Sequence, residues 1–568
     1  MRRVAASIVA CAAIPALPTA VAIAHLNRLG FADAVIVGAW LWQLSLVLMA
    51  GPLALTAGGC YLVGRPCGFR ELGGLALAGL FAFFWACRLE PVHQPLSIRP
   101  HISLIGVLQI ALIAGLSGLV LVAAWSRRGR VSVAIAAVVA AAGSVLMLLA
   151  STVLVEPARD RTAAVTSLAT MVAEPAPQGS PSGRVLILGI DGLEWRAIER
   201  LVRTGRTPTL ARLIANGRFY QLDNRRMAIS PQIWTALYTG RTERDNLVGG
   251  FEAWHFTGAS RPVIFLPHFG VHPVWMLDLF LARFQGLGGW TEHASTTVQI
   301  RTPPLWTLAS AEGRRVAVFD PVPFRAVGEQ VRGIFVWPGD EGFKIASAAD
   351  DDDPAPVVAV EPYPDIAPHD PDAEDRFERA RVELAARLFA ETRPDLAIYY
   401  THALDSLSHH HWDFRLRDSW FGGDPQGYVA EPFDGSPIAE GYERLDAALA
   451  TLVSAFGEGT VVLVSDHGWS FSDYEHFLSP YGVLVIAHTG AAGYGGVADV
   501  LSVAPTVLSL LGVPADARMQ RPLADVTGPV HAPRDYSTVR REFIFDDNPL
   551  DEAARRRLLE SLGYFRAR

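Results

Sequence analysis

An aspartate and a histidine follow a strand-like run near the carboxyl end of the chain. Residues 461–464 read Val-Val-Leu-Val, an apolar and mostly β-branched run typical of a buried strand, and Gly468 marks the turn that ends it. Asp466 and His467 lie in that turn. Ligands of open α/β sheets bind at the carboxyl ends of strands, and carboxylate oxygen and imidazole nitrogen both bind zinc. The stretch predicts either a metal site or a surface turn with incidental polar residues.

Two earlier parts of the chain repeat this order of strand and ligand. The apolar run 184–190 leads into Asp191, and the run 395–400 leads into Asp405 and then His409. A spacing of four residues places Asp405 and His409 on one face of a helix, where both could bind one ion. A solvated helix end is the alternative for this pair. Each match is weak alone, but the shared order and placement favour a single site.

These residues belong to a longer ordered set that resembles a known superfamily. The set is Asp191-Gly192, Ser230 with Trp234-Thr235 and Thr239-Gly240, Asp405-x-x-x-His409, Asp466-His467-Gly468, and His476. It is similar to the motifs of the alkaline phosphatase superfamily, and most similar to its type I phosphodiesterase/nucleotide pyrophosphatase branch. The run 499–514 resembles the closing helix of that family. The resemblance covers roughly residues 184–525 and none of the sequence before them.

The resemblance implies a two-metal site in an α/β sandwich. It assigns one ion to Asp191, Ser230, Asp466 and His467, and the other to Asp405, His409 and His476. Two divalent ions, zinc or alternatively manganese, would stabilise the attacking and leaving oxygens of an in-line displacement at phosphorus. A serine hydroxyl is a weak nucleophile at neutral pH, and metal coordination activates it without a neighbouring base. The resemblance therefore implies that Ser230 is the nucleophile of a phospho-enzyme mechanism.

The local sequence around Ser230 fits this role. Ser230 precedes Pro231, which disfavours helical backbone at the serine, as a turn from strand to helix requires. Family members often have threonine here, and serine keeps the hydroxyl. A serine that caps the following helix is compatible with a nucleophile, and a helix N-terminus also favours the negative charge of phosphate.

Two departures from the family bear on the substrate. Asn246-Leu247 stand where the family commonly has His-Gly, and Phe251 stands where nucleotide-cleaving members have an asparagine that contacts phosphate. We therefore expect a lipid- or glycan-linked phosphodiester rather than a nucleotide, with Asn246, Phe251 and Trp234 as candidate substrate contacts. The sulfatase branch fits poorly, because its motif places proline one position later and adds an arginine.

The sequence up to about residue 155 predicts a membrane region. Charges are sparse there, and five stretches are long and apolar enough to cross a bilayer: 4–26, 34–63, 72–91, 102–125 and 131–155. The first is alternatively a cleaved signal peptide. Arginines are concentrated in alternate flanks, and the positive-inside rule then places everything after the last span outside the inner or plasma membrane, on the periplasmic or extracellular side. The spans have no acidic residue or lysine deep inside, which favours an anchor, or an entry surface for a lipid, over an ion pathway.

Composition excludes other classes. The net charge of −8 and the absence of a basic cluster after the membrane region argue against a nucleic-acid partner. All four cysteines, Cys11, Cys60, Cys67 and Cys87, precede the soluble part, which therefore has no disulfide, thiolate ligand or cysteine nucleophile.

The predicted organisation places a transmembrane bundle before the catalytic part. Residues 1–156 are expected as an all-α membrane domain, 157–183 as a linker, and 184–535 as an α/β sandwich with a central, mostly parallel sheet. Within the sandwich, 252–300 form an aromatic insertion that is either a lid or a packed subdomain. Residues 536–568 are expected as a helical tail.

The sequence thus predicts a membrane-anchored, outward-facing, two-metal phosphodiesterase. The first alternative is a phosphoethanolamine- or phosphoglycerol-type transferase, in which a lipid or glycan hydroxyl replaces water. The second is a catalytically silent binding or assembly protein of the cell envelope, which the complete set of seven matching ligands argues against.

Overall fold

The computed structural model divides the chain into two units. One consists of Met1–Leu154 with Glu252–His293, and the other of Val155–Phe251 with Ala294–Arg568. The structure describes residues 24, 29–43, 159–171, 183–224, 230–246, 248, 250, 252–260, 263, 289–294, 300, 302–321, 331–339, 342–347, 357–358, 371–411, 433–469, 481–527 and 530–539.

The described part of the first unit is a helix over residues 31–43 and a two-stranded sheet of β3 (Glu252–Phe256) and β4 (Trp290–Ala294). The Trp40 ring meets Trp290 edge-on with centroids 6.3 Å apart, and Trp40 Nε1 donates to the Thr257 carbonyl at 3.1 Å. The Asp33 carboxylate accepts hydrogen bonds from the backbone N–H and the hydroxyl of Ser260. The described residues of the aromatic insertion thus pack on an N-terminal helix.

The membrane prediction falls mostly outside the described residues. Of the five predicted spans, only residues 24 and 34–43 are described. Within the part of the chain that the structure describes, no helix has both the length and the apolar character needed to cross a bilayer.

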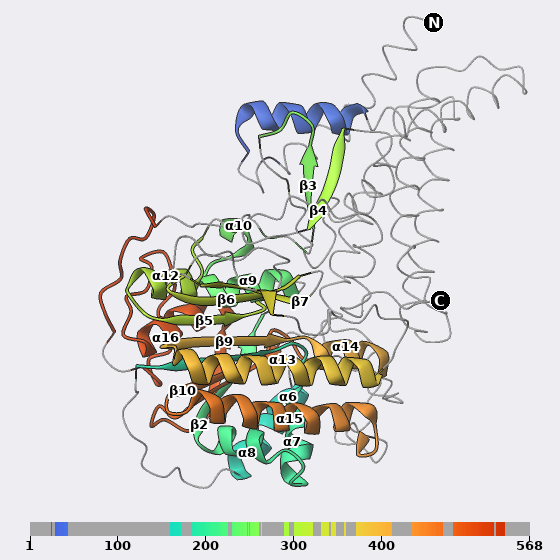
Figure 1. The fold of residues 1–568 in the computed structure, drawn as a ribbon, viewed down its shortest axis with the longest axis vertical. Helices are drawn as coiled ribbons and strands as arrows, with labels where there is room; N and C mark the ends of the chain where they lie inside the picture. Colours follow the sequence, from blue (N-terminus) through green and yellow to red (C-terminus); the bar gives the residue numbers. More distant parts are fainter. Residues whose placement is uncertain are drawn as a thin grey trace, which may run out of the picture. The chain divides into compact units, whose positions relative to one another are not determined.

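The second unit is built on a ten-stranded sheet with the order β12-β2-β11-β10-β1-β9-β5-β6-β7-β8 (Figure 1). The five neighbouring strands from β10 to β6 are mutually parallel, and the strands on both sides of them include antiparallel pairs. The predicted α/β fold with a mostly parallel central sheet is therefore confirmed. The strands of this sheet are β1 (Val185–Ile190), β2 (Gly217–Asp223), β5 (Val316–Phe319), β6 (Gly333–Gly339), β7 (Gly342–Ser347), β8 (Val357–Val358), β9 (Leu396–Thr401), β10 (Thr460–Val464), β11 (Tyr481–Ala487) and β12 (Gly493–Asp499).

The apolar runs in the sequence form the centre of this sheet because both of its faces are covered. Every residue of β1, β9, β10 and β11 is buried. Strands buried on both faces have near-continuous apolar sequences rather than alternating ones. The strand-like runs noted in the sequence therefore correspond to central strands, whereas β2 and β12 have mixed sequences and carried no such signal.

Helices form a layer on each face of the sheet (Figure 1). Leu186, Leu188 and Ile190 of β1 pack into one layer, whereas Val185 and Ile187 pack into the other, as the alternation of a strand requires. The first layer contains α7 (Trp195–Arg203), α8 (Pro208–Ala215), α13 (Pro371–Thr392), α14 (Ala403–His411) and α15 (Pro437–Phe456); the second contains α9 (Ser230–Thr239), α12 (Leu305–Ala311) and α16 (Val503–Leu510). The described part of this unit also contains α6 (Arg159–Met171), α10 (Glu243–Asn246) and the 3₁₀ turn η7 (Val500–Ser502).

Part of the predicted linker is a packed helix. α6 (Arg159–Met171) buries Val165 and Leu168 completely and contributes to the first helical layer. The Ser167 hydroxyl donates to Glu199 of α7 at 2.7 Å. The linker prediction is therefore wrong for these residues: apolar residues at positions 165 and 168, spaced i,i+3, gave the segment a buried face that its Ala/Ser-rich composition obscured.

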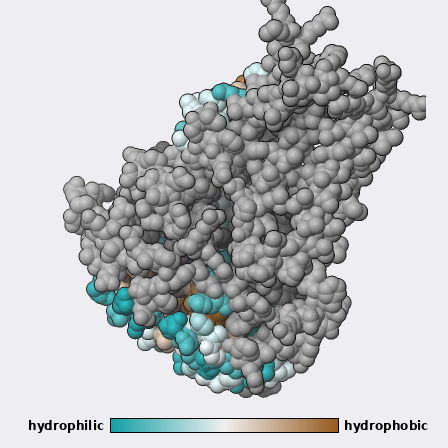
Figure 2. All heavy atoms as spheres, turned by 90° about the vertical axis from the view of Figure 1, so that its right-hand side faces the viewer, coloured by the Kyte–Doolittle hydropathy of each residue, from teal (hydrophilic) through white to brown (hydrophobic). Residues whose placement is uncertain are grey.

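The surface of the described residues is mainly polar. In Figure 2 the lower group of coloured residues is mostly hydrophilic around a small hydrophobic area. Large exposed apolar side chains in the second unit are few among the described residues, namely Met171, Val497 and Val530. The helix over 31–43 differs, because Phe31 is 88% and Val35 53% exposed.

Candidate metal centre

Adjacent strand ends bring the predicted ligands together. Asp191 directly follows β1, and β1 pairs in parallel with both β9 and β10. Asp405 lies on α14, which begins two residues after β9, while Asp466 and His467 follow β10. The carboxyl ends of parallel neighbours lie at one edge of the sheet, where ligands of such folds bind. Ser230, the first residue of α9, also reaches this edge, as its distance to His467 shows.

The Nε2 atom of His467 lies at the centre of the cluster. It is 3.0 Å from Asp191 Oδ1, 3.2 Å from Ser230 Oγ, 3.5 Å from Asp466 Oδ2 and 3.7 Å from Asp405 Oδ1. One oxygen or nitrogen each from Asp191, Asp466 and His467 lies within 4.8 Å of the other two. All of these residues are at least 95% buried. The structure therefore brings together four residues assigned to one predicted ion, with Asp405 beside them.

His409 extends this cluster along α14. Its Nε2 lies 3.3 Å from Asp405 Oδ2, as expected for residues four apart on a helix. Its ring meets the Trp469 indole edge-on, with centroids 4.9 Å apart. The third ligand predicted for the second ion, His476, lies outside the described residues.

A hydrogen bond to a backbone carbonyl determines the tautomer of His467. Its Nδ1 lies 3.1 Å from the carbonyl oxygen of Gly468. A carbonyl oxygen only accepts hydrogen bonds, so Nδ1 carries the proton. In the neutral ring the lone pair is then on Nε2 and faces the carboxylates. Metal-binding histidines commonly have this arrangement, in which the second nitrogen donates to a carbonyl or carboxylate.

Several carboxylate oxygens in the cluster receive no hydrogen bond. Among the described residues, none donates a hydrogen bond to Asp191 Oδ1, Asp405 Oδ1 or either carboxylate oxygen of Asp466. Nearly all buried polar atoms of folded proteins have such a partner. Oxygen atoms that face one another and a histidine nitrogen without donors are suited to a divalent cation. The donor set therefore fits the predicted metal chemistry.

The pKa shifts in the cluster also favour a bound cation. Burial and the neighbouring Asp191 raise the pKa of Asp466 well above its usual range. Burial also opposes ionisation of Asp191, but His467 and a hydrogen bond from Tyr400 hold its pKa at about 2. Burial opposes protonation of His467, yet the surrounding carboxylates, above all Asp466, raise its pKa to about 10. Three crowded carboxyl groups thus give the site a strong preference for positive charge.

Two buried side chains hold Asp191 in place. Its Oδ2 accepts hydrogen bonds from the Tyr400 hydroxyl at 2.7 Å and from Trp234 Nε1 at 3.1 Å. Trp234 has no exposed surface, so the structure gives this predicted substrate contact the role of orienting Asp191.

Asn246 is likewise buried, and its amide hydrogen-bonds to the residues at the end of α9. Its amide donates to Thr239 Oγ1 at 2.8 Å and to the carbonyl of Arg241 at 2.9 Å, which ties α10 to the end of α9. It has no exposed surface, and its role as a substrate contact stays a prediction. Phe251, the third candidate contact, lies outside the described residues.

A buried ion pair supports Trp469 behind the two histidines. Glu194 accepts hydrogen bonds from Arg196 Nε at 2.8 Å and from the backbone N–H of Trp469 at 2.9 Å. Arg196 in turn donates to the Trp469 carbonyl at 2.7 Å, and the Trp469 indole donates to Gly192. The Trp469 ring contacts His409 and lies 6.3 Å from the His467 ring. The pair thus fixes the residue that packs against both histidines.

Sequence reasoning did not find the residues that support the ligands. Tyr400 is the penultimate residue of a predicted strand, and Trp469 directly follows His467-Gly468. Both were therefore adjacent to predicted ligands, but an aromatic residue at such a position is more often simply part of a core. Glu194 and Arg196, two residues apart at the start of a helix, gave no signal of a buried pair.

The fold and the buried cluster define an α/β protein with a candidate metal centre at the carboxyl edge of its sheet. Residues 185–501, more than half of the chain, match the model of the type I phosphodiesterase / nucleotide pyrophosphatase family. The chain belongs to this family. The matched range contains every predicted ligand.

Solved structures match this chain at low identity and low TM-score. A phosphonoacetate hydrolase from Sinorhizobium meliloti 1021 is 16% identical, with 51% of this chain and 57% of that chain covered and a TM-score of 0.29. A variant of the alkaline phosphatase PafA is 12% identical, with 62% and 99% covered and a TM-score of 0.37. The 2-O GAG sulfatase BT1596 is 12% identical, with 63% and 76% covered and a TM-score of 0.35. A search among curated proteins found no match.

Proposed function

We propose that the chain is a metal-dependent phosphodiesterase in which Ser230 attacks phosphorus and a phospho-enzyme forms. The observation that carries the proposal is the position of Ser230 Oγ, 3.2 Å from His467 Nε2 and at the edge of the Asp191–Asp405–Asp466 cluster. Membership of a phosphodiesterase family supports the same reaction.

The donor set supports two divalent ions, zinc or manganese. Asp191, Ser230, Asp466 and His467 would hold one, and Asp405, His409 and His476 the other. When bound, such ions supply positive charge that lowers the pKa of a coordinated hydroxyl and stabilises the oxygens of an in-line phosphoryl transfer. The buried carboxylate oxygens without hydrogen-bond donors support this assignment.

The chain's own groups account for the bond changes. Ser230 Oγ forms a bond to phosphorus as the bond from phosphorus to one ester oxygen breaks, and one proton, equal to that lost by the serine hydroxyl, reaches this oxygen, which leaves as an alcohol. Water then adds to phosphorus, the Oγ–phosphorus bond breaks, and Ser230 regains a proton. The phosphomonoester that leaves retains the second ester group. Ser230 is the first residue of α9, where the helix N-terminus favours a phosphate group.

The proposal includes a location and a substrate class. Five apolar stretches before residue 156 would anchor the chain in the inner or plasma membrane, with the catalytic unit on the periplasmic or extracellular side. The substrate would be a phosphodiester linked to a lipid or a glycan. The sequence supports this through Phe251 and Asn246-Leu247, which replace residues of nucleotide-cleaving members.

The full-length chain, its Ser230→Ala variant and its Ser230→Thr variant test the reaction. We expect about two metal ions per chain, and hydrolysis of bis-p-nitrophenyl phosphate that exceeds hydrolysis of p-nitrophenyl sulfate. Ser230→Ala should abolish turnover, whereas Ser230→Thr, which keeps a hydroxyl, should retain part of it.

Three results would contradict the proposal. Faster turnover of the sulfate ester would show a sulfatase, and a fully active Ser230→Ala variant would exclude the nucleophile. Metal binding with transfer of the phosphoryl group to an added lipid or glycan alcohol, but no hydrolysis, would show a transferase instead.

A further inference from the structure

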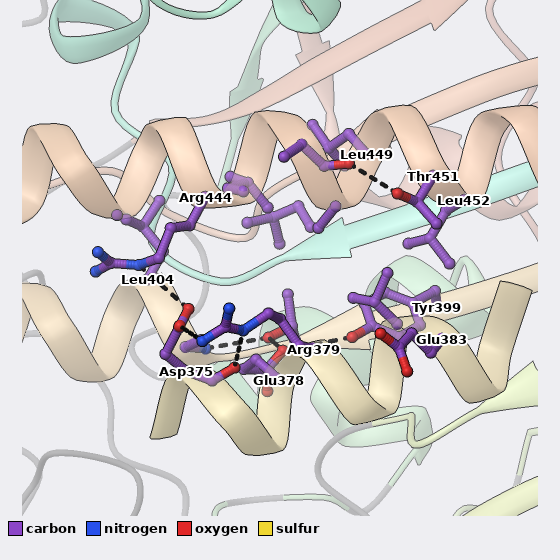
Figure 3. A pocket seen from close by; sticks show the side chains of 18 of the residues that line it. Asp375, Glu378, Arg379, Glu383, Tyr399, Leu404, Arg444, Leu449, Thr451 and Leu452 are labelled. Carbon is purple, nitrogen blue, oxygen red and sulfur yellow. Dashed lines mark hydrogen bonds and ion pairs between the residues drawn. The ribbon is translucent and has the colours of Figure 1, made fainter. Parts of the chain in front are cut away.

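Acidic side chains of the second unit are oriented in different ways. In the groove between α13, α14 and α15, Asp375 pairs with Arg379 and Arg444, and Figure 3 shows the three side chains converging. In the metal centre, hydrogen bonds from two buried aromatic side chains orient Asp191. Asp466 receives no hydrogen bond at either carboxylate oxygen from the described residues. The fold therefore positions this predicted ligand chiefly through its backbone.

Asn224 holds the backbone of Asp466. Its Nδ2 donates to the Asp466 carbonyl oxygen at 2.7 Å, and the residue is only 3% exposed. Asn224 directly follows β2, which is separated from β10 by β11 in the sheet. The amide therefore reaches past Tyr481, the first residue of β11, to residues 465–468, which follow β10 and are called the ligand loop below.

Gly482 of β11 leaves room for the ligand loop beside this strand. A Cβ atom added to Gly482 would lie 2.1 Å from the Ser465 carbonyl oxygen and 2.9 Å from the Asp466 carbonyl oxygen. Both separations are well below van der Waals contact, so any side chain here would push the ligand loop away from β11. The close approach of two backbones thus requires glycine at this position.

Ser465 connects the ligand loop to the loop that carries Asp191. Its hydroxyl donates to the His467 carbonyl oxygen at 2.9 Å and accepts a hydrogen bond from the backbone N–H of Leu193 at 2.9 Å. Leu193 follows Asp191 by two residues, so one hydroxyl joins both loops that provide ligands. Ser465 has no exposed surface, and its own N–H donates to the carbonyl of Val483 in β11 at 2.8 Å.

We propose that Asn224 and Ser465 are positioning residues of the metal centre. The Asn224 amide ties the ligand loop to the end of β2, and the Ser465 hydroxyl ties it to the loop after β1. Neither residue belongs to the predicted ligand set, so each acts on the ion only through the ligands. This role rests on the proposed function, because it has an effect only if the cluster binds a metal ion.

The two side chains act against the repulsion within the cluster. In the metal-free chain the carboxyl groups of Asp191, Asp405 and Asp466 crowd around His467, and like charges so close together repel one another. A ligand loop without these restraints relaxes away from the other carboxylates, and a metal ion must then draw it back. That cost lowers metal affinity, as the loss of outer partners of metal ligands commonly does by about 10- to 100-fold.

Zinc binding to the full-length chain tests this role. Zinc affinity is measured by competition with a chromogenic chelator, and cobalt(II) is a second probe because its visible absorption depends on the geometry of its ligands. Asn224→Ala and Ser465→Ala should each lower zinc affinity about 10- to 100-fold for one of the two ions and change the cobalt spectrum. A variant that keeps the affinity and spectrum of the wild type would show that its residue does not position the site. Absence of zinc binding in the wild type would contradict the proposed function instead.

Ser436→Ala is the matched control for Ser465→Ala. The Ser436 hydroxyl also donates to one backbone carbonyl, that of Phe433, and accepts from one backbone N–H, that of Ala439, but it caps the start of α15. Ser436→Ala should lower the melting temperature, as loss of a helix cap does, and leave zinc affinity within about twofold. An equal loss of zinc affinity in both serine variants would show a general effect of stability and overturn the role of Ser465.

Asn224→Leu separates the hydrogen bond from packing. Leucine branches at Cγ as asparagine does, but it has no donor for the Asp466 carbonyl. It should lower zinc affinity as much as Asn224→Ala does. Wild-type affinity in Asn224→Leu would mean that packing holds the ligand loop and that the amide has no positioning role.

Hydrogen exchange in the metal-free chain measures the restraint itself. Asn224→Ala should speed amide exchange in a peptide covering residues 465–468, and Ser436→Ala should not. Equal exchange in the metal-free wild-type and Asn224→Ala chains would show that the ligand loop is held without this hydrogen bond, whatever the activity of the enzyme.

Discussion

Two buried ionic clusters lie near the carboxyl edge of the sheet, and they are built in opposite ways. In the first, the carboxylates Asp191, Asp405 and Asp466 surround one imidazole nitrogen. In the second, the guanidinium of Arg381 is fully buried, donates to Asp320 at 2.7 Å and is paired with Glu378. In the first cluster, several carboxylate oxygens receive no hydrogen bond from the described residues. In the second, the carboxylates are paired with the cationic side chain of Arg381.

The difference separates a structural use of buried charge from a functional one. Burial would lower the pKa of Arg381, but Glu378 and Asp320 raise it, so the arginine stays charged and its partners stay paired. Burying charges is costly unless they are paired and hydrogen-bonded. A fold retains the first cluster at a cost to its own stability, which is expected of a site that binds a cation.

Tyr400 joins the two clusters. Its backbone carbonyl accepts a hydrogen bond from Arg381 at 2.9 Å, and its hydroxyl donates to Asp191 at 2.7 Å. The arginine cluster therefore positions a residue that orients Asp191 of the carboxylate cluster.

The largest expected effect separates the clusters by activity. Asp466→Asn should lower kcat/KM for bis-p-nitrophenyl phosphate by about 10³-fold or more, because a metal supplies several kcal/mol of transition-state stabilisation and 1.36 kcal/mol is tenfold in rate. The melting temperature without metal should stay the same or rise, since the change removes a crowded buried carboxylate. Both are measured on the purified variant, by steady-state kinetics and by thermal unfolding.

Asp320→Asn is the matched control. It changes a buried carboxylate to an amide in the other cluster, and asparagine tolerates the positive φ of 49° at this position. Activity should fall less than tenfold while the melting temperature falls. A loss of activity equal to that of Asp466→Asn would show that both clusters serve the reaction.

The second prediction separates the clusters by stability. Arg381→Met removes a fully buried cation and leaves the partly buried Glu378 and Asp320 without it, so the free energy of unfolding should fall by about 3 kcal/mol. Arg203→Met removes an exposed partner of Glu199 and should cost less than about 1 kcal/mol. Urea unfolding of the metal-free chains measures both. Equal losses in the two variants would mean that the buried pair contributes no more than a surface pair.

The two clusters also differ in how far the sequence predicts them. Asp191, Asp405 and Asp466 each follow an apolar strand, so strand periodicity and the edge rule for α/β sheets indicated a common site. Arg381 lies in the middle of a 22-residue helix among other charged residues, where nothing distinguishes a buried arginine from an exposed one. Which face of α13 is buried depends on the strand order of the sheet. That order rests on crossovers between distant segments, which one sequence does not reveal.

The sequence also did not reveal which segment the described residues of the aromatic insertion contact. Trp290 and Ser260 contact Trp40 and Asp33, which lie more than 220 residues earlier in the chain. Aromatic composition left a lid and a packed subdomain as alternatives, and it carried no information about the segment's partner.

A smaller effect is expected where the clusters meet. Tyr400→Phe keeps the buried ring and removes only the hydroxyl that donates to Asp191. Hydrogen bonds to charged groups are worth about 1.5–3 kcal/mol, so kcat/KM should fall roughly 10- to 100-fold. Tyr399→Phe, on the same strand and also buried, is the control and should leave kcat/KM within about twofold. If Tyr400→Phe were as active as the control, Asp191 would not depend on this link.

The smallest expected effect concerns the support of the two histidines. Trp469→Phe keeps an aromatic ring beside His409 but removes the indole hydrogen bond to Gly192. A neutral hydrogen bond contributes about 1 kcal/mol, so metal affinity should fall roughly fivefold, whereas Trp469→Ala, which also removes the ring, should lower it by about 10- to 100-fold. Competition with a chelator of known affinity measures both. If Trp469→Ala bound metal as tightly as the wild type, the carboxylates alone would determine affinity and the histidines would need no fixed orientation. If Trp469→Phe and Trp469→Ala lost affinity equally, the hydrogen bond to Gly192 rather than the ring would be the support.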